Sequence, residues 1–452
     1  MTIADLDMTP GDVDLSEDGV ARAFAEMQAG YRLYDNDAGK WFVYVGDCWQ
    51  LDHTQSTTFA ARELVNTVSF KINSNKRTRY RSSSFVSGVE RLARSDPALS
   101  VRQENFDTDL WLLGCPGVTV DLRTGKPREP DPRDMITRLT SVAPAETAHC
   151  PRWDDFLSEA TGGDDDMKGF LQRFLGYSLT GFTTEHALIF AWGGGGNGKS
   201  VFQNTAANIM GDHATHAAME TFISSRQDRH STELAYLRGA RLVTASETDE
   251  GRAWAEARIK TLTGGDPVTA RFMHKDPFTF IPQFKLLIVG NHQPALQSVD
   301  DAARRRFNIV PFTRRPEKPD PDLEAKLRKE HPQILRWMID GCLDWQANGL
   351  KRPQSVLDAT AEYFSEQDFV GQWLGEVAIL EPGNPHRFTS SADLFASWKA
   401  YAEKAGEMVG AQKGLAGKLR RFGLTTEMRS IGGQKLRGWV GVSLKVRASG
   451  HD

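Results

Sequence analysis

The chain has 452 residues, of which 40% are hydrophobic and 25% charged, enough for roughly two to four domains. No stretch approaches the roughly 18 apolar residues of a membrane helix, and the N-terminus lacks a signal peptide, so we expect a cytoplasmic protein with no membrane partner. The four cysteines show no C-x-x-C spacing, which indicates neither a disulfide framework nor a zinc cluster.

The net charge of −4 is unevenly distributed along the chain. Residues 1–20 contain six acidic residues and neither lysine nor arginine, which predicts a disordered acidic tail. Residues 411–449 contain nine basic residues and one acid, Glu427, a balance of +8. Such a segment is typical of contacts with DNA or with a partner protein.

An N-terminal α+β domain is expected over residues 21–148. The aromatic-rich WFVYVGDCWQLD (41–52) predicts strands, and a helical stretch follows it. The basic KINSNKRTRYR (71–81) is interpreted as a solvated loop, with a nucleic-acid contact as the alternative. PGVTVDLRTGKPREPDP (116–132) predicts a strand, a turn at Thr124-Gly125 and a proline-rich exit.

Residues 149–350 show the alternation of an α/β domain. Residues 152–179 have helical periodicity interrupted at Gly162-Gly163, and HALIFAW (186–192) predicts a buried strand before the helical SVFQNTAANIM (200–210). After these come the strands RLVTAS (241–246), KLLIV (285–289) and FNIVPF (307–312), the helix AWAEARIKTL (253–262) and the hairpin-like VTARFMHKDPFTFI (268–281). Strands that alternate with helices predict a mostly parallel sheet covered on both faces.

The remainder of the chain is expected to form a connector and a small domain. TRRPEKPDPD (313–322) is interpreted as a connector, helices continue to about residue 350, and residues 351–364 form a linker. In residues 365–452, two helices (392–406 and 414–423) precede the strand-like GWVGVSLKV (438–446). This order is compatible with a basic, winged-helix-like C-terminal domain.

A glycine-rich loop between a strand and a helix matches G-x-x-x-x-G-K-[ST], the P-loop pattern. Backbone N–H groups of such a loop bind phosphates, Lys199 neutralises the β and γ phosphates, and Ser200 ligates Mg²⁺. A flexible linker is the alternative interpretation. The pattern predicts ATP and Mg²⁺ as cofactors, bound by Gly193, Gly194, Gly195, Gly196, Asn197, Gly198, Lys199, Ser200 and Val201.

Hydrolysis also needs a carboxylate, a residue that orients water and a cation at the transferred phosphate. Glu247 is the first acid after strand 241–246 and is the expected catalytic and magnesium-shell residue, with Asp249 and Glu250 as weaker candidates. Asn291 follows the next strand and could orient water. The run Arg304 to Arg306 is either a surface patch or the source of an arginine for a neighbouring subunit.

The motifs GGGGNGKS, ASETDEG, LLIVGNHQP and RRRFNIVPF, with CPRWDDFL upstream, together resemble the superfamily 3 helicases. The resemblance covers most of residues 30–312 and is to the helicase portion of phage, plasmid and poxvirus-type primase-helicases. It implies an AAA+-type core that forms a ring, usually a hexamer, and moves on single-stranded DNA from 3′ to 5′.

Carried over by position, Lys199 and Ser200 match the Walker A pair, Glu247 the Walker B acid and Asn291 the sensor. Arg305 or Arg306 matches the arginine finger. The hairpin would hold DNA through Arg271, His274 and Lys275. In this chain Thr248 stands where family members often carry a second acid, and no primase half is present. The chain is therefore expected to be a stand-alone helicase or part of a longer protein, and Met1 with its acidic leader favours a natural start.

The leading hypothesis is an ATP-driven replicative DNA helicase of a phage or mobile element, acting on single-stranded and forked DNA in the bacterial cytoplasm. A separate primase or another replication protein is the expected partner. The first alternative is a ring ATPase that loads, packages or remodels nucleoprotein without unwinding. The second is a DNA-binding initiator whose nucleotide is structural.

Overall fold

A computed structural model describes residues 13–70, 72, 74–224, 232–246, 252–296, 301–406 and 409–445. The chain divides into two compact units, each of which is described by itself. The larger comprises Met1–Pro294 and Arg305–Val356, and the smaller comprises Ala295–Arg304 and Leu357–Asp452. No helix within the described ranges combines the length and the apolar composition needed to cross a lipid bilayer.

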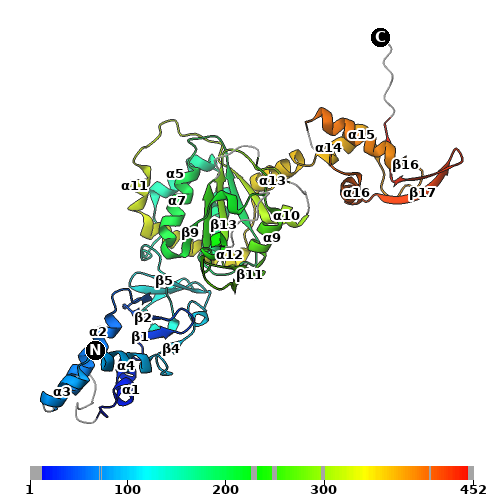
Figure 1. Cartoon of the computed structure of the whole chain (residues 1–452). Helices are drawn as coiled ribbons and strands as arrows, with labels where there is room; N and C mark the ends of the chain where they lie inside the picture. The colour runs from blue at the N-terminus through cyan, green and yellow to red at the C-terminus, as the bar shows by residue number, and fades with distance from the viewer. Residues whose placement is uncertain are drawn as a thin grey trace. The chain divides into compact units, whose positions relative to one another are not determined.

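The larger unit begins with helices α1 to α4 and a four-stranded sheet of order β3-β2-β1-β4, and α1, α2 and α4 supply most of the core residues here (Figure 1). Trp41 of β2 lies in this core and its Nε1 donates to the buried Glu90 at 3.0 Å. The elements are α1 (Glu17–Gln28), β1 (Arg32–Asp35), β2 (Lys40–Tyr44), β3 (Trp49–Leu51), α2 (Ser56–Val68), α3 (Ser74–Tyr80), α4 (Ser83–Ala93), β4 (Ser100–Val101) and η2 (Gln103–Asn105).

Two predictions for this region were wrong. The acidic tail was expected to reach residue 20, but α1 begins at Glu17 because the Ser16 hydroxyl caps it, accepting from Gly19 N at 3.0 Å. The segment 71–81 was expected as a loop, but it is helical over Ser74–Tyr80. There Arg77 donates to Ile72 O at 2.9 Å, a local contact that composition alone does not reveal.

A small antiparallel sheet of order β5-β6-β7 follows, and it contains the predicted turn. Gly125 has φ 69° and donates its N–H to Asp121 O at 2.8 Å, so a residue with a side chain would be strained there. The proline-rich exit that follows the turn begins with a short strand, β7. The elements are β5 (Leu112–Cys115), β6 (Val118–Asp121), β7 (Lys126–Arg128) and η3 (Pro132–Asp134).

The centre of the larger unit is a parallel five-stranded sheet of order β14-β8-β13-β10-β9. The predicted parallel α/β arrangement is confirmed for these strands. They are β8 (Leu188–Trp192), β9 (Ala214–His216), β10 (Leu242–Ser246), β13 (Lys285–Gly290) and β14 (Phe307–Pro311). The antiparallel pair β11 (Val268–Ala270) and β12 (Phe278–Phe280) forms the predicted hairpin between β10 and β13.

Both faces of this sheet are covered. On one face, α7 packs on β9, β10 and β13, and α12 packs on α6 and α7. On the other face, the Trp254 ring lies edge-on to the rings of Phe190 and Phe307, with ring centroids 5.6 and 5.3 Å apart. The helices are α5 (Pro151–Thr161), α6 (Asp165–Ser178), α7 (Lys199–Met210), η4 (Gly211–His213), η5 (Met219–Thr221), α8 (Thr232–Ala235), α9 (Glu256–Gly264), α10 (Asp301–Arg306), α11 (Leu323–Arg328) and α12 (His331–Asn348).

In the smaller unit, helices α15 and α16 precede a long β-hairpin, β17–β18, and the core includes Trp373, Trp398 and Trp439. Strand β18 pairs with both β16 and β17, and β15 pairs with β19. Residues 351–364 were expected as a linker but contain most of α13. The elements are α13 (Gln354–Glu366), α14 (Phe369–Val377), β15 (Ala378–Leu380), β16 (Phe388–Ser390), α15 (Ser391–Lys404), α16 (Gln412–Arg420), β17 (Thr425–Ile431), β18 (Gln434–Val440) and β19 (Val442–Leu444).

Candidate nucleotide and nucleic-acid sites

The glycine loop lies between the end of β8 and the start of α7. A Cβ at Gly193 would lie 1.9 Å from Phe312 O, and a Cβ at Gly198 would lie 2.7 Å from the ring of Phe156. Gly198 also has φ 85°. Only glycine fits these two positions, because neighbouring backbone and ring atoms fill the space that a side chain would need.

Lys199 is held across this loop at the start of α7. Its Nζ donates to Gly193 O at 2.7 Å, to Gly194 O at 2.9 Å and to Asn197 Oδ1 at 2.8 Å. The Asn197 amide nitrogen in turn donates to Phe312 O, which follows β14. Lys199 is buried, and burial lowers the pKa of its ammonium. The loop, the ammonium and the end of β14 therefore form one hydrogen-bonded unit.

The loop also presents an open face. A Cβ at Gly195 or Gly196 would meet no atom within 4 Å, so the backbone there is accessible to a ligand. Ser200 is exposed in the first turn of α7, whereas Val201 is half-buried against the core. This arrangement suits a phosphate group over the loop with Lys199 and Ser200 beside it.

Gln203 connects the helix after the loop to two strands, a role that sequence reasoning missed. Its buried amide nitrogen donates to Ala245 O and Leu287 O, both at 2.9 Å, and its Oε1 accepts from Ser246 Oγ at 3.1 Å. The only signal in the sequence is a polar residue on the apolar face of α7. The contact fixes α7 relative to the ends of β10 and β13.

The expected acidic residues Glu247, Asp249 and Glu250 lie outside the described residues. β10 ends at Ser246. Because the strands are parallel, this is the carboxyl edge of the sheet, where β8 also ends. Asn291 directly follows β13 at this same edge, and its side chain is exposed. The structure thus brings Asn291 to the edge that carries the glycine loop.

Arg305 and Arg306 lie at the amino edge of the sheet, where its parallel strands begin, opposite the edge that carries the glycine loop. They are the last residues of α10 and precede β14, whose first residue, Phe307, pairs with Leu188 at the start of β8. β14 has five residues, which at a rise of about 3.3 Å per residue separates the two edges by about 16 Å. The two arginines are therefore remote from the glycine loop of their own chain.

A cavity of about 410 Å³ lies beside these arginines. It is lined by Glu185, His186, Arg305, Arg306 and Arg352. Arg352 donates from Nη2 to Arg305 O at 2.5 Å, and burial lowers the pKa of the Arg352 guanidinium. The cavity lining is mainly cationic, which suits an anionic group.

The hairpin expected to hold DNA has exposed basic residues at its turn. Arg271, His274 and Lys275 are all exposed, and His274 adopts a left-handed backbone with φ 60°. Met273 and Ile281 nearby are 70% and 61% exposed. A cationic tip flanked by apolar side chains can contact a phosphate backbone and bases without reading sequence.

Aromatic stacking supports the stem of this hairpin. Phe272 stacks on Phe278 with ring centroids 5.5 Å apart, and Tyr236 lies edge-on to Phe272 at 5.5 Å. The guanidinium of Arg238 lies 4.9 Å from the Phe278 ring. Four side chains therefore join the hairpin to the segment that follows α8.

Arg315 is a second residue that sequence reasoning missed, because residues 313–322 were interpreted as a connector. Its Nη2 lies 3.3 Å from the position that a Cβ at Gly194 would occupy. Its positive charge, after burial, is the second cause that lowers the pKa of Lys199. No sequence signal distinguishes Arg315 from its neighbour Arg314.

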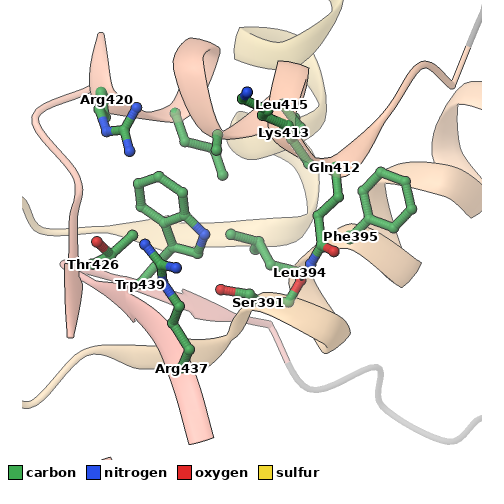
Figure 2. Close-up of a pocket in the computed structure, with 12 residues that line it drawn as sticks. Ser391, Leu394, Phe395, Gln412, Lys413, Leu415, Arg420, Thr426, Arg437 and Trp439 are labelled. Carbon is green, nitrogen blue, oxygen red and sulfur yellow. Dashed lines mark hydrogen bonds between the residues drawn. The ribbon is translucent and has the colours of Figure 1, made fainter. Parts of the chain in front are cut away.

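The smaller unit has a cavity of about 490 Å³ between α15, α16 and the β17–β18 hairpin (Figure 2). Its walls are largely apolar, with Trp439 between the side chains of Arg420 and Arg437 in Figure 2. The lining includes three cations and no acidic residue: Ser391, Leu394, Phe395, Gln412, Lys413, Leu415, Ala416, Leu419, Arg420, Thr426, Arg437 and Trp439.

Two regions of the chain match family models. Residues 21–162 match a family described as D5 N terminal like, and residues 191–306 match a family of unknown function, DUF5906. The solved structure titled "The apo structure of NrS-1 C terminal region (305-718)" is 10% identical, with a TM-score of 0.51 over 95% of this chain and 100% of that one. That likeness shows a shared fold.

Viral proteins are among the relatives. "Putative helicase L207/L206" of Acanthamoeba polyphaga mimivirus is 28% identical over 62% of this chain and 32% of that protein. "Putative helicase 022R" of Frog virus 3 is 23% identical over 52% and 26%, and "Putative primase C962R" of African swine fever virus is 25% identical over 34% and 16%. The chain spans about a third or less of these relatives.

The matched regions coincide with the segments that carry the sequence motifs. The D5 N terminal like match covers the N-terminal sheets and α5, and the second match runs from the glycine loop to Arg306. The chain is therefore similar to the helicase portion of viral primase-helicases.

Proposed function

We propose that this chain is an ATP-driven replicative DNA helicase of a phage or mobile element, built on an AAA+-type P-loop core. The observation that carries the proposal is the loop that holds Lys199 at the sheet edge shared with Asn291. Mg²⁺ would bind through Ser200 and the nucleotide, and would neutralise developing phosphate charge. Glu247 would hold the magnesium shell and polarise the attacking water.

The position of the arginines supports a ring. Arg305 and Arg306 lie about 16 Å from the glycine loop along a five-residue strand, so they act on the nucleotide of a neighbouring subunit. Head-to-tail contacts of this kind close into a ring when the rotation allows it. A hexamer is the assembly that the resemblance favours.

A strand-displacement experiment tests whether the chain unwinds DNA and with which polarity. The chain with ATP and Mg²⁺ is mixed with labelled duplexes that carry either a 3′ or a 5′ single-stranded tail. We expect displacement of the 3′-tailed duplex alone. ATP hydrolysis without displacement of either duplex would favour a loader or remodeller, and negligible hydrolysis with sequence-specific duplex binding would favour the initiator.

The hairpin provides the matched variants for this experiment. Lys275→Ala removes the exposed charge at the hairpin turn and is expected to stop displacement while ATP binding persists. Lys275→Arg keeps the charge and is expected to retain displacement. Full displacement by Lys275→Ala would contradict a role of the hairpin in DNA movement.

We further propose that the smaller unit is a winged-helix-like module that binds DNA. Support comes from two helices followed by the β17–β18 hairpin and from the three cations beside the cavity in Figure 2. The double variant Arg420→Ala/Arg437→Ala is expected to weaken DNA binding and to reduce the slope of log Kd against log salt by roughly two. Fluorescence anisotropy at several salt concentrations measures this slope.

Arg429→Ala is the control for that measurement. Arg429 lies 2.8 Å from Glu427 and 4.8 Å from the ring of Phe388, so its charge is engaged within the protein. We expect its loss to leave the salt slope nearly unchanged. An unchanged slope in the double variant would count against DNA binding at this surface.

A further inference from the structure

The segment that leaves β14 passes directly over the glycine loop. Phe312 N donates to Trp192 O at 2.7 Å, and Phe312 O accepts from the side chain of Asn197. Strand β14 therefore delivers the next residues of the chain to the loop of the same subunit. Arg314 and Arg315 follow three residues or fewer after this anchor.

The side chains of the two arginines lie near different parts of the larger unit. Arg315 Nη2 is 3.3 Å from the Cβ position of Gly194, whose carbonyl accepts from Lys199. Arg314 Nε is instead 3.1 Å from the Cβ position of Gly162, at the end of α5. Adjacent residues of the same type thus offer a test position and a matched control.

Arg315 makes no hydrogen bond or ion pair with any residue in the described part of the chain, and its side chain is exposed. Burial of Lys199 and, after it, the positive charge of Arg315 lower the pKa of the Lys199 ammonium. Two like charges beside one loop repel each other, and an anion between them would attract both. The attraction of a bound anion to Lys199 and to Arg315 would then offset the repulsion between the two cations.

We propose that Arg315 binds the terminal phosphates of the nucleotide held by the glycine loop of its own subunit. This inference rests on the proposed ATP site and adds a cation that the motif pattern does not contain. Arg315 would differ from Arg305 and Arg306, which lie at the opposite edge of the sheet. The nucleotide would then contact arginines from two subunits, one from each side.

Nucleotide binding tests the contact directly. Titration calorimetry with Mg²⁺ and a slowly hydrolysed ATP analogue is expected to show that Arg315→Ala weakens affinity roughly tenfold to a hundredfold. Arg315→Lys keeps the charge but loses the guanidinium geometry, so its affinity is expected to lie between those of Arg315→Ala and the unchanged chain. Arg314→Ala is expected to bind normally.

Mixed rings test whether the contact is within one subunit. Arg315→Ala subunits mixed with Lys199→Ala subunits are expected to recover no ATPase activity, because each defect lies in a subunit's own site. Recovery in this mixture would show that Arg315 acts across an interface and would overturn the proposal.

Several other outcomes separate the inference from the proposed function. Normal analogue binding by Arg315→Ala, with Lys199→Ala inactive, would overturn the inference and leave the ATPase intact. Equal losses in Arg314→Ala and Arg315→Ala would indicate a structural role of the segment and would also overturn it. Normal ATP turnover by Lys199→Ala would contradict the assignment of the ATP site itself. If Arg315→Ala does not fold, analogue binding by Arg315→Lys at the level of the unchanged chain would overturn the contact.

Discussion

Lys199→Ala is expected to reduce ATP turnover by roughly 10² to 10³-fold, because it removes one preorganised charge-stabilising donor at the phosphates. Lys199 Nζ is already held by two loop carbonyls and the Asn197 side chain. All three Nζ protons are used in these bonds, so a bound phosphate would replace at least one of these acceptors. Phosphate release at saturating ATP measures the effect.

Lys168→Ala is the control for Lys199→Ala. Lys168 belongs to the same unit and lies 2.8 Å from Asp154, remote from the glycine loop in the chain. We expect its turnover to equal that of the unchanged chain. Turnover by Lys199→Ala at the same level would remove the basis for the nucleotide site.

Arg306→Ala is expected to bind ATP normally and to lose roughly 10³ to 10⁵-fold in turnover, the range seen when an arginine finger is absent. The reason is geometric, since Arg306 lies at the sheet edge opposite the loop of its own chain. Binding affinity and turnover must be measured separately, because only turnover is expected to change. Arg305→Ala, tested in parallel, shows which of the two arginines contributes the charge.

Mixing Arg306→Ala subunits with Lys199→Ala subunits provides the second part of this test. Interfaces that join an intact loop to an intact arginine form in such mixtures, so partial activity is expected to return. Activity that stays absent at every mixing ratio would leave a role across the interface unsupported. The pair also contrasts with the Arg315 mixture, in which no recovery is expected.

The central strands were predictable because their sequences are continuous apolar runs. β8, β10, β13 and β14 each begin and end within two residues of the predicted bounds, as expected for strands buried on both faces. The three-residue β9 was missed because it is too short to show a pattern. β17 was missed because nearly all of its residues are exposed and polar.

Only the part of the candidate site that is contiguous in sequence was predictable. The loop from Gly193 to Ser200 is a local pattern, so its position between β8 and α7 follows from sequence alone. Gln203 bonds to strands that lie far away in sequence, and Arg315 reaches the loop from the segment after β14. Contacts of this kind depend on tertiary packing, and no spacing rule encodes them.

The stacked hairpin stem has a mechanical consequence. Phe272, Phe278, Tyr236 and Arg238 form a continuous series of ring contacts that joins the hairpin to the segment after α8. These contacts favour movement of the hairpin together with that segment over bending at the base of the hairpin. If the hairpin makes the proposed DNA contact, weakening these ring contacts is expected to lower the length of DNA displaced per ATP hydrolysed without lowering the rate of hydrolysis.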